Sequence, residues 1–144
     1  MKLTDEEKNL LVDACLEAKN NAYAKYSNFR VGAALLSEDG RIFKGCNVEN
    51  VSYGLTICAE RTAYVKAVSE GVQKFKGIAV CTDVKKRLVS PCGACRQFMS
   101  EFNDIEIVMT NNEKERKETK LSELLPMAFD DEALQNGQKN GIPT

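Results

Sequence analysis

The 144-residue chain contains no histidine. This absence excludes every site that depends on an imidazole: Ser-His-Asp triads, Cys-His proteases, HExxH metalloproteases, facial-triad iron and His-ligated haem. Any bound metal must therefore be held by thiolates or carboxylates. Any catalytic proton must be moved by Glu, Asp, Cys, Lys or Tyr.

An excess of positive charge is also lacking, because 20 Lys and Arg stand against 21 Asp and Glu, for a net charge of −1. Proteins that bind nucleic-acid backbones usually carry a basic excess, since neutralising phosphates drives their affinity. The balance favours a small-molecule substrate and disfavours nucleic acid. The short basic run Lys85-Lys86-Arg87 is interpreted as a solvated loop.

No apolar run approaches the roughly 20 residues of a membrane span, and residues 1–8 are polar, without the pattern of a signal peptide. We therefore expect a cytoplasmic protein with no membrane partner. In that compartment its six cysteines are metal ligands or core residues, not disulfides. The length predicts one domain over 1–144, with a polar tail over 135–144 that frays.

Hydrophobic periodicity and turn residues predict alternating helices and strands. Thr4 and Glu7 form a capping box at the start of a helix over 4–25. Asp39-Gly40 indicates a hairpin turn between the first two strands. Helices are also predicted over 58–70, 92–102 and 121–125, and strands over 31–37, 41–45, 78–82, 105–110 and 117–120.

The order of these elements predicts a layered α/β domain. A hairpin comes first, and a strand–helix–strand unit follows, which implies a right-handed parallel crossover. Helices then cover both faces, giving a three-layer α/β/α sandwich around a mixed sheet of about five strands. The small residues Gly32-Ala33-Ala34 leave room for a close neighbour, either a packed helix or a ligand.

The segment most suggestive of chemistry is Cys92-Gly93-Ala94-Cys95, which opens a helix directly after Pro91. Alone, this CxxC fits a redox pair, half of a four-Cys zinc site, or two ligands of a catalytic zinc. The redox interpretation needs a thioredoxin-like order of elements, which is not the order predicted for this chain.

A second cysteine, in Cys58-Ala59-Glu60, also lies at the start of a predicted helix. Helix N-termini favour thiolates, and two such helices can direct three thiolates to one zinc ion. Three ligands with an open fourth position make a catalytic site, whereas Cys46 or Cys81 as a fourth ligand would close a structural one. The nearby Glu60 favours the catalytic arrangement, as general base and general acid. Arg61 would offset the negative charge of the ligands.

The two cysteine motifs resemble those of a known family. Cys58-Ala59-Glu60-Arg61-Thr62-Ala63 and Ser90-Pro91-Cys92-Gly93-Ala94-Cys95-Arg96-Gln97 are similar to the zinc motifs of the short, homotetrameric class of cytidine deaminases. The segments 26–34, 45–50 and 124–129 also match, and the likeness extends over about 23–134. Lys25 departs from the pattern, since the family often has proline there.

The resemblance implies hydrolytic deamination of cytidine and 2′-deoxycytidine to the uridine nucleosides with release of ammonia, a reaction of pyrimidine salvage. It implies one Zn²⁺ per subunit, held by Cys58, Cys92 and Cys95, with Glu60 moving protons. It also implies a homotetramer whose sites are shared between subunits.

The same resemblance implies a set of residues that bind the nucleoside. Asn47 and Glu49 would contact the ribose 3′-hydroxyl, and Phe29 would line the pocket. The backbone of Ala59 would contact the edge of the base. Across a subunit boundary, Phe129 would stack on the pyrimidine and Tyr53 would reach the neighbouring site.

Two alternatives stay open from the sequence. One is a related deaminase for the nucleoside antibiotic blasticidin S or for a base in RNA or DNA. The Asn47-Val48-Glu49 motif disfavours the antibiotic, and the acidic pI of about 5.6 disfavours the polynucleotide. The other alternative is a non-catalytic interaction module stabilised by zinc, which a closed shell of four cysteines would support.

Overall fold

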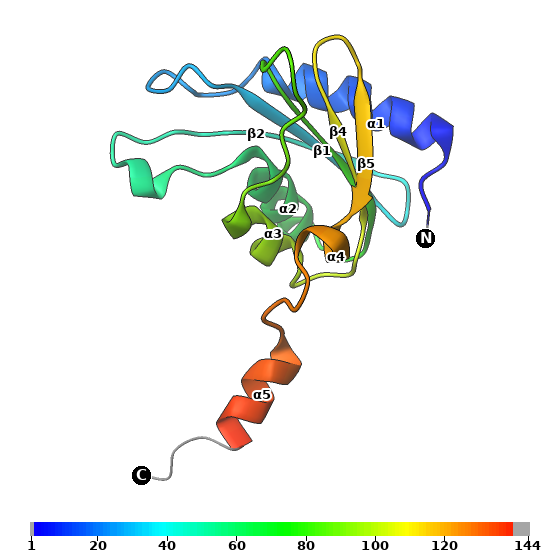
Figure 1. The fold of residues 1–144 in the computed structure, drawn as a ribbon, viewed down its shortest axis with the longest axis vertical. Helices are drawn as coiled ribbons and strands as arrows, with labels where there is room; N and C mark the ends of the chain where they lie inside the picture. Colours follow the sequence, from blue (N-terminus) through cyan, green and yellow to red (C-terminus); the bar gives the residue numbers. More distant parts are fainter. Residues whose placement is uncertain (1, 140–144) are drawn as a thin grey trace.

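A computed structural model describes residues 2–139 of the chain (Figure 1). Its helices and strands follow one another in an order close to the predicted one. The elements are α1 (Asp5–Lys19), β1 (Val31–Ser37), β2 (Ile42–Cys46), the 3₁₀ helix η1 (Tyr53–Leu55), α2 (Ala59–Ser69), β3 (Phe75–Thr82), α3 (Gly93–Met99), β4 (Glu106–Thr110), β5 (Arg116–Lys120), α4 (Leu121–Leu124) and α5 (Asp131–Lys139).

The five strands form one mixed sheet in the order β2-β1-β3-β4-β5. β3 and β4 run parallel, and every other neighbouring pair is antiparallel. The chain passes from β3 to β4 through α3, which is the predicted crossover. The predicted hairpin, crossover and five-stranded mixed sheet are therefore confirmed.

Helices cover both faces of this sheet (Figure 1). α1 packs on one face, where Leu11 and Val12 join a core with residues of β1, β3 and β4. α2 and α3 pack on the other face, where Ala63 and Met99 belong to the second core. The arrangement is the predicted α/β/α sandwich, and it places the N-termini of α2 and α3 on the same side of the sheet.

Two glycines allow the helices to approach the sheet closely. A Cβ atom on Gly32 would lie 2.1 Å from the carbonyl oxygen of Cys15 in α1. A Cβ atom on Gly45 would lie 2.5 Å from the carbonyl oxygen of Ala59 in α2. The close neighbour that the small residues of β1 predict is thus a packed helix and not a ligand.

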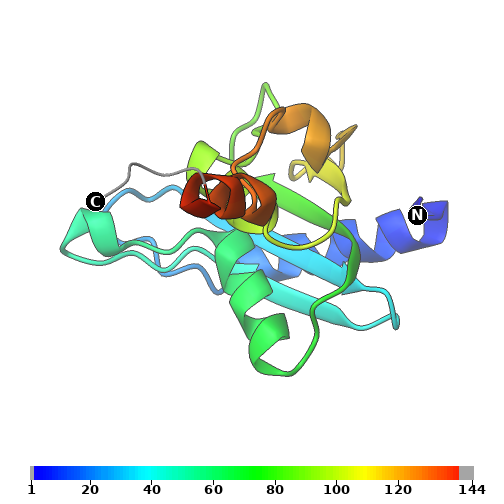
Figure 2. The same ribbon diagram turned by 90° about the horizontal axis from the view of Figure 1, so that it is seen from below.

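The end of the first helix differs from the sequence prediction. α1 ends at Lys19, six residues before the predicted end, because the Tyr23 amide donates to the carbonyl of Asn47 at 2.9 Å and draws the chain away from the helix. The segments 23–30 and 47–57 project together from one side of the sheet (Figure 2).

The helix α5 was not predicted. The sequence predicts a frayed tail over 135–144, but residues 135–139 belong to α5. Residues 140–144 lie outside the residues that the structure describes. α5 extends away from the sandwich (Figure 1) and buries none of its side chains. Within residues 2–139, the longest apolar stretch of any helix falls short of what crossing a membrane requires.

Candidate metal centre

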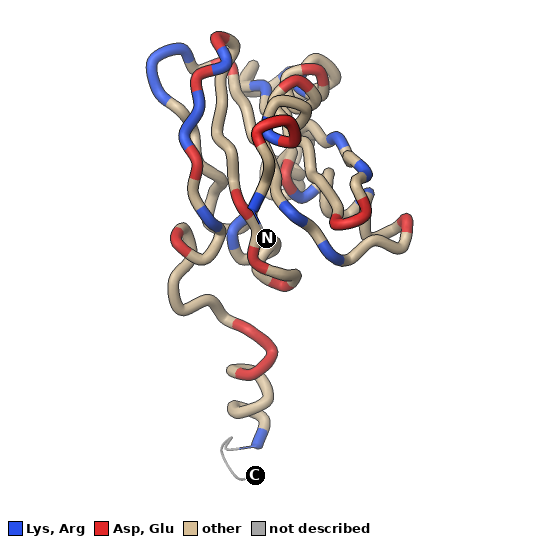
Figure 3. Tube along the Cα trace, turned by 90° about the vertical axis from the view of Figure 1, so that its right-hand side faces the viewer, with Lys and Arg blue, Asp and Glu red and all other residues tan. Residues whose placement is uncertain are grey.

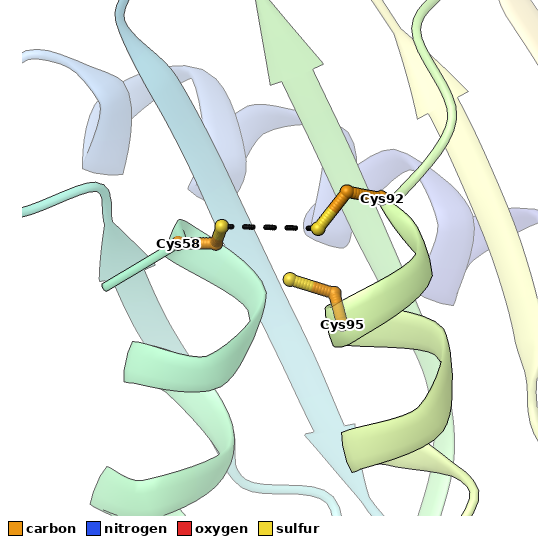
Figure 4. Close-up of side chains that lie close together, drawn as sticks. All are labelled: Cys58, Cys92 and Cys95. Atoms are coloured by element: carbon orange, nitrogen blue, oxygen red, sulfur yellow. Dashed lines mark hydrogen bonds between the residues drawn. The ribbon is translucent and has the colours of Figure 1, made fainter. Parts of the chain in front are cut away.

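The N-termini of α2 and α3 bring three cysteines together. Cys58 is the N-cap of α2, Cys92 is the N-cap of α3, and Cys95 lies in the first turn of α3. Their sulfur atoms all lie within 4.8 Å of one another, and Figure 4 shows the three thiols pointing toward a common centre. The sulfurs of Cys58 and Cys92 are 4.0 Å apart.

This geometry suits zinc. Tetrahedral Zn²⁺ with Zn–S bonds of 2.3 Å places its sulfur ligands about 3.8 Å apart, close to the observed separation. Across residues 2–139, this cluster of potential ligands contains no fourth residue. Cys81, one of the candidates for closing the shell, lies under α1, where its thiol donates to the carbonyl of Cys15 at 3.2 Å. The donor set therefore fits a zinc ion with three protein ligands.

The thiols differ in their protonation. A hydrogen bond from Cys95, helped by Arg61, lowers the pKa of Cys58 to about 5. The same contact and burial raise the pKa of Cys95, which is the proton donor of the pair. Arg61 Nη2 also donates to the Cys58 sulfur at 3.5 Å, a contact that the charge-offsetting role requires. Zinc binding removes the remaining thiol protons, because zinc ligates thiolates.

Glu60 lies in the first turn of α2 and lines the cavity beside the cysteine cluster, together with Cys58 and Cys92. Its side chain is only 4% exposed. Burial raises the pKa of Glu60 to about 7, and the neighbouring Cys58 thiolate contributes in the same direction. A carboxyl group at this position can both accept and return a proton near neutral pH.

A cavity of about 410 Å³ opens beside this cluster, a size that suits a small molecule. Six of the residues singled out in the sequence line it: Phe29, Asn47, Glu49, Cys58, Glu60 and Cys92. The remaining lining residues were given no role in the site from the sequence: Ser27, Val31, Thr56, Val80, Thr82, Val89 and Ser90. Val80 and Thr82 are two apart in β3 and share one face, so the alternation of the strand was the available signal.

The side chain of Asn47 is engaged with the cavity wall. Its Oδ1 accepts from the Val31 amide at 3.0 Å, and its Nδ2 donates to the Phe29 carbonyl at 2.8 Å. Each of these atoms keeps further hydrogen-bonding capacity, because an amide group offers two donors and two acceptor sites. Asn47 can thus fix the wall and still face a ligand.

Glu49 likewise binds the cavity wall and faces the cavity. Its carboxylate accepts from the amides of Tyr26 and Ser27 at 3.0 and 3.1 Å, and also from the Ser27 hydroxyl. The hydroxyl of Ser27 is the main cause that lowers the pKa of Glu49, so the group faces the cavity as a carboxylate. The segment 26–31 is therefore shaped by the two residues that the family resemblance assigns to the ribose.

The structure does not bring every predicted residue to the cavity. Tyr53, in η1, and Phe129, after α4, are 75% and 61% exposed, and neither lines the cavity of this chain. The side-chain amide of Gln97 donates to the Phe129 carbonyl at 2.8 Å. Ala59 is the buried first residue of α2, so only its backbone could meet a ligand.

Comparison with known proteins gives a consistent result. The profile of the family described as "Cytidine and deoxycytidylate deaminase zinc-binding region" matches residues 5–111. A probable cytidine deaminase of Dictyostelium discoideum is 52% identical over 132 residues, which cover 92% of this chain and 90% of the relative. The cytidine deaminase of Sporosarcina psychrophila is 50% identical over 126 residues, covering 86% and 92% respectively.

Among solved structures, the crystal structure of cytidine deaminase from Burkholderia pseudomallei superposes with a TM-score of 0.81. It is 46% identical, and the match covers 88% of this chain and 100% of that protein. The fold and the sequence likeness thus agree with the three-thiol zinc site that the geometry indicates.

Proposed function

The chain belongs to the cytidine and deoxycytidylate deaminase family, and from this premise we propose that it hydrolyses cytidine to uridine and ammonia, with 2′-deoxycytidine as a second substrate. The observation that carries the proposal is the buried Glu60 beside three convergent thiols, where Glu60, Cys58 and Cys92 line a cavity of nucleoside size.

Cys58, Cys92 and Cys95 would hold the zinc ion. When bound, Zn²⁺ supplies Lewis acidity that makes water nucleophilic near neutral pH. Three thiolates leave the centre with a net negative charge, which opposes this effect. The N-termini of α2 and α3 and the guanidinium of Arg61, 3.5 Å from the Cys58 sulfur, offset that charge.

Glu60 would move the protons of the reaction. As water adds to C4 of the cytosine ring, the carboxylate accepts a water proton and passes it to N3. Glu60 then helps to protonate the 4-amino group, which leaves as ammonia. The burial of Glu60 at the start of α2 keeps the carboxyl beside the reacting atoms and away from bulk water.

The cavity wall would hold the nucleoside. Asn47 and Glu49 offer their remaining hydrogen-bonding capacity to the ribose 3′-hydroxyl, and Phe29 packs beside the sugar and base. The backbone at Ala59 would meet the edge of the base. Because Asn47 and Glu49 already hydrogen-bond to the segment 26–31, this wall is formed before the substrate arrives.

An ultraviolet assay of cytidine loss, on protein of measured zinc content with and without a chelator, tests the proposal. Glu60→Gln should keep its zinc and lose activity by about 10²–10⁴-fold or more, as is typical of a general acid–base group. The matched control is Glu101→Gln, the same substitution at an exposed site after α3, which should retain wild-type turnover. Turnover retained by Glu60→Gln would refute the mechanism.

The choice among substrates is tested by comparing cytidine with dCMP, blasticidin S and a cytosine-containing oligonucleotide. Cytidine is favoured because Asn47 and Glu49 suit a ribose. Figure 3 shows Lys and Arg interspersed with Asp and Glu along the described trace, with no long run of one sign to follow a phosphate backbone. Faster turnover of the oligonucleotide would reverse this choice.

We also propose the homotetramer, with Tyr53 and Phe129 reaching the site of a neighbouring subunit. Large apolar side chains are exposed in the projecting loops and after α4, and such exposure favours burial in an assembly. They include Val51, Tyr53, Leu55, Met127 and Phe129. Sedimentation velocity on the zinc-loaded protein should give one species of about four chains, and a monomer would refute the homotetramer.

The cytoplasmic location expected from the sequence stays a prediction.

A further inference from the structure

A cluster of charged side chains lies directly behind the cavity wall. Arg30 stands between Phe29 and Val31, and both of those neighbours line the cavity. Asp83 follows Thr82, which also lines the cavity and lies opposite Val31 in the β1–β3 register. Arg30 and Asp83 are therefore the next cross-strand positions beyond a pair that forms the wall.

Asp83 makes several charged contacts. Arg30 donates to both of its carboxylate oxygens, from Nε at 2.8 Å and from Nη2 at 3.1 Å. Lys19, from the end of α1 and only 3% exposed, donates to Asp83 at 2.6 Å, and the Asn112 amide donates at 3.4 Å. A two-point contact between arginine and a carboxylate fixes orientation as well as distance.

The alternation of side chains along a strand explains why this cluster is separate from the cavity. Since Val31 and Thr82 face the cavity, Arg30 and Asp83 point toward the opposite face, where α1 and Lys19 lie. The short segment 29–31 is thus held from two sides. On the cavity side Asn47 bonds to the Phe29 carbonyl and the Val31 amide, and on the far side Arg30 is bonded to Asp83.

We propose that Asp83 is a positioning residue: through Arg30 it holds the segment that carries Phe29 and Val31 at the nucleoside end of the cavity. The inference rests on the proposed function. Glu60 and the N-cap Cys58 belong to α2, which packs on the face of the sheet opposite α1 and the Arg30–Asp83 contact. Loss of the Arg30–Asp83 contact should therefore weaken substrate binding and leave the chemical step largely intact.

The test compares Asp83→Asn and Arg30→Gln with the wild type, all loaded with zinc. We expect KM for cytidine to rise about tenfold in both variants while kcat stays within about twofold, the pattern of lost binding without lost chemistry. The matched control is Asp39→Asn, since Asp39 forms another ion pair with an arginine, Arg41, at 2.9 Å in the β1–β2 turn. Its kcat and KM should both match the wild type.

A double variant and a thermal unfolding scan separate positioning from a merely structural role. If the contact acts as one unit, Arg30→Gln combined with Asp83→Asn should raise KM no further than either change alone. A lower unfolding temperature with unchanged KM would overturn the proposal, and so would an equal fall in kcat and kcat/KM. Should Asp83→Asn fail to fold, Arg30→Gln decides, because Arg30 is 43% exposed and its loss leaves Lys19 paired.

The proposed function can fail independently. A wild-type protein that neither deaminates cytidine nor binds it in calorimetry refutes the function, and the positioning role with it. An active wild type whose two variants keep the wild-type KM refutes only the role of Asp83.

Discussion

Replacing Gly45 by alanine should reduce activity through packing alone. Gly45 lies in β2 under the first turn of α2, and a Cβ atom there would stand 2.5 Å from the carbonyl oxygen of Ala59 and 2.6 Å from the amide nitrogen of Ala63. Ordinary contact begins near 3.4 Å. Both clashing atoms are helix backbone, so no side chain can rotate away, and α2 and β2 must move apart by about 0.9 Å.

This shift acts on the residues proposed for chemistry, since Ala59 lies between Cys58 and Glu60. A displacement of about 1 Å at a reacting group can cost roughly 10²-fold in rate. Overpacking of this kind also costs about 1–3 kcal/mol of stability. We therefore expect kcat/KM for cytidine to fall by about 10- to 100-fold, measured well below the unfolding temperature on protein of known zinc content.

Gly77→Ala is the matched control. A Cβ atom on Gly77 would lie 2.6 Å from Cδ1 of Leu3, the end of a flexible side chain, and 3.0 Å from the carbonyl oxygen of Glu106 in β4. Leu3 packs on the face of the sheet opposite α2. This variant should lose some stability and keep wild-type kcat/KM. If Gly45→Ala is folded and its kcat/KM stays within about twofold of wild type, packing under α2 does not set the position of Glu60.

Two further predictions concern charged side chains. Arg61→Gln removes the donor to the Cys58 sulfur, so zinc affinity measured against a chromogenic chelator should fall by about 10–100-fold, and an unchanged affinity would contradict the role of Arg61. Hydrogen bonding from Arg30 holds the pKa of Asp83 below its usual range, so its stabilising effect is present above about pH 4 and is lost as the pH falls toward the folded-state value. Urea unfolding of wild type and Asp83→Asn should show a difference in stability that narrows below about pH 4, and a constant difference would contradict this assignment.

Local signals account for what the sequence predicted correctly. The capping box at Thr4 is formed, with the Glu7 amide donating to the Thr4 hydroxyl at 3.1 Å. The three cysteines converge because two of them cap helices that pack on the same face of the sheet. Each of these features depends on residues close together in the chain or on the simple rule that connects strands to helices.

The features that the sequence did not predict depend on distant partners. The end of α1 is set by the bond between Tyr23 and Asn47, which competes with a continuing apolar stripe. The cluster around Asp83 joins residues 64 and 53 positions apart, and no periodicity connects them. α5 has a single large apolar residue, Leu134, and buries no side chain, so too few apolar residues mark it as a packed helix in the sequence.

The site therefore has two parts held by different forces. Cys58 and Glu60 stand on a helix whose position is fixed by close backbone packing on Gly45. The nucleoside end of the cavity has no such support, because the segment 26–31 lies outside the helices and strands except for Val31. It is held by hydrogen bonds and ion pairs from Asn47, Glu49 and Asp83. It follows that substitutions in the core under α2 should act mainly on kcat, whereas substitutions in the polar clamps should act mainly on KM.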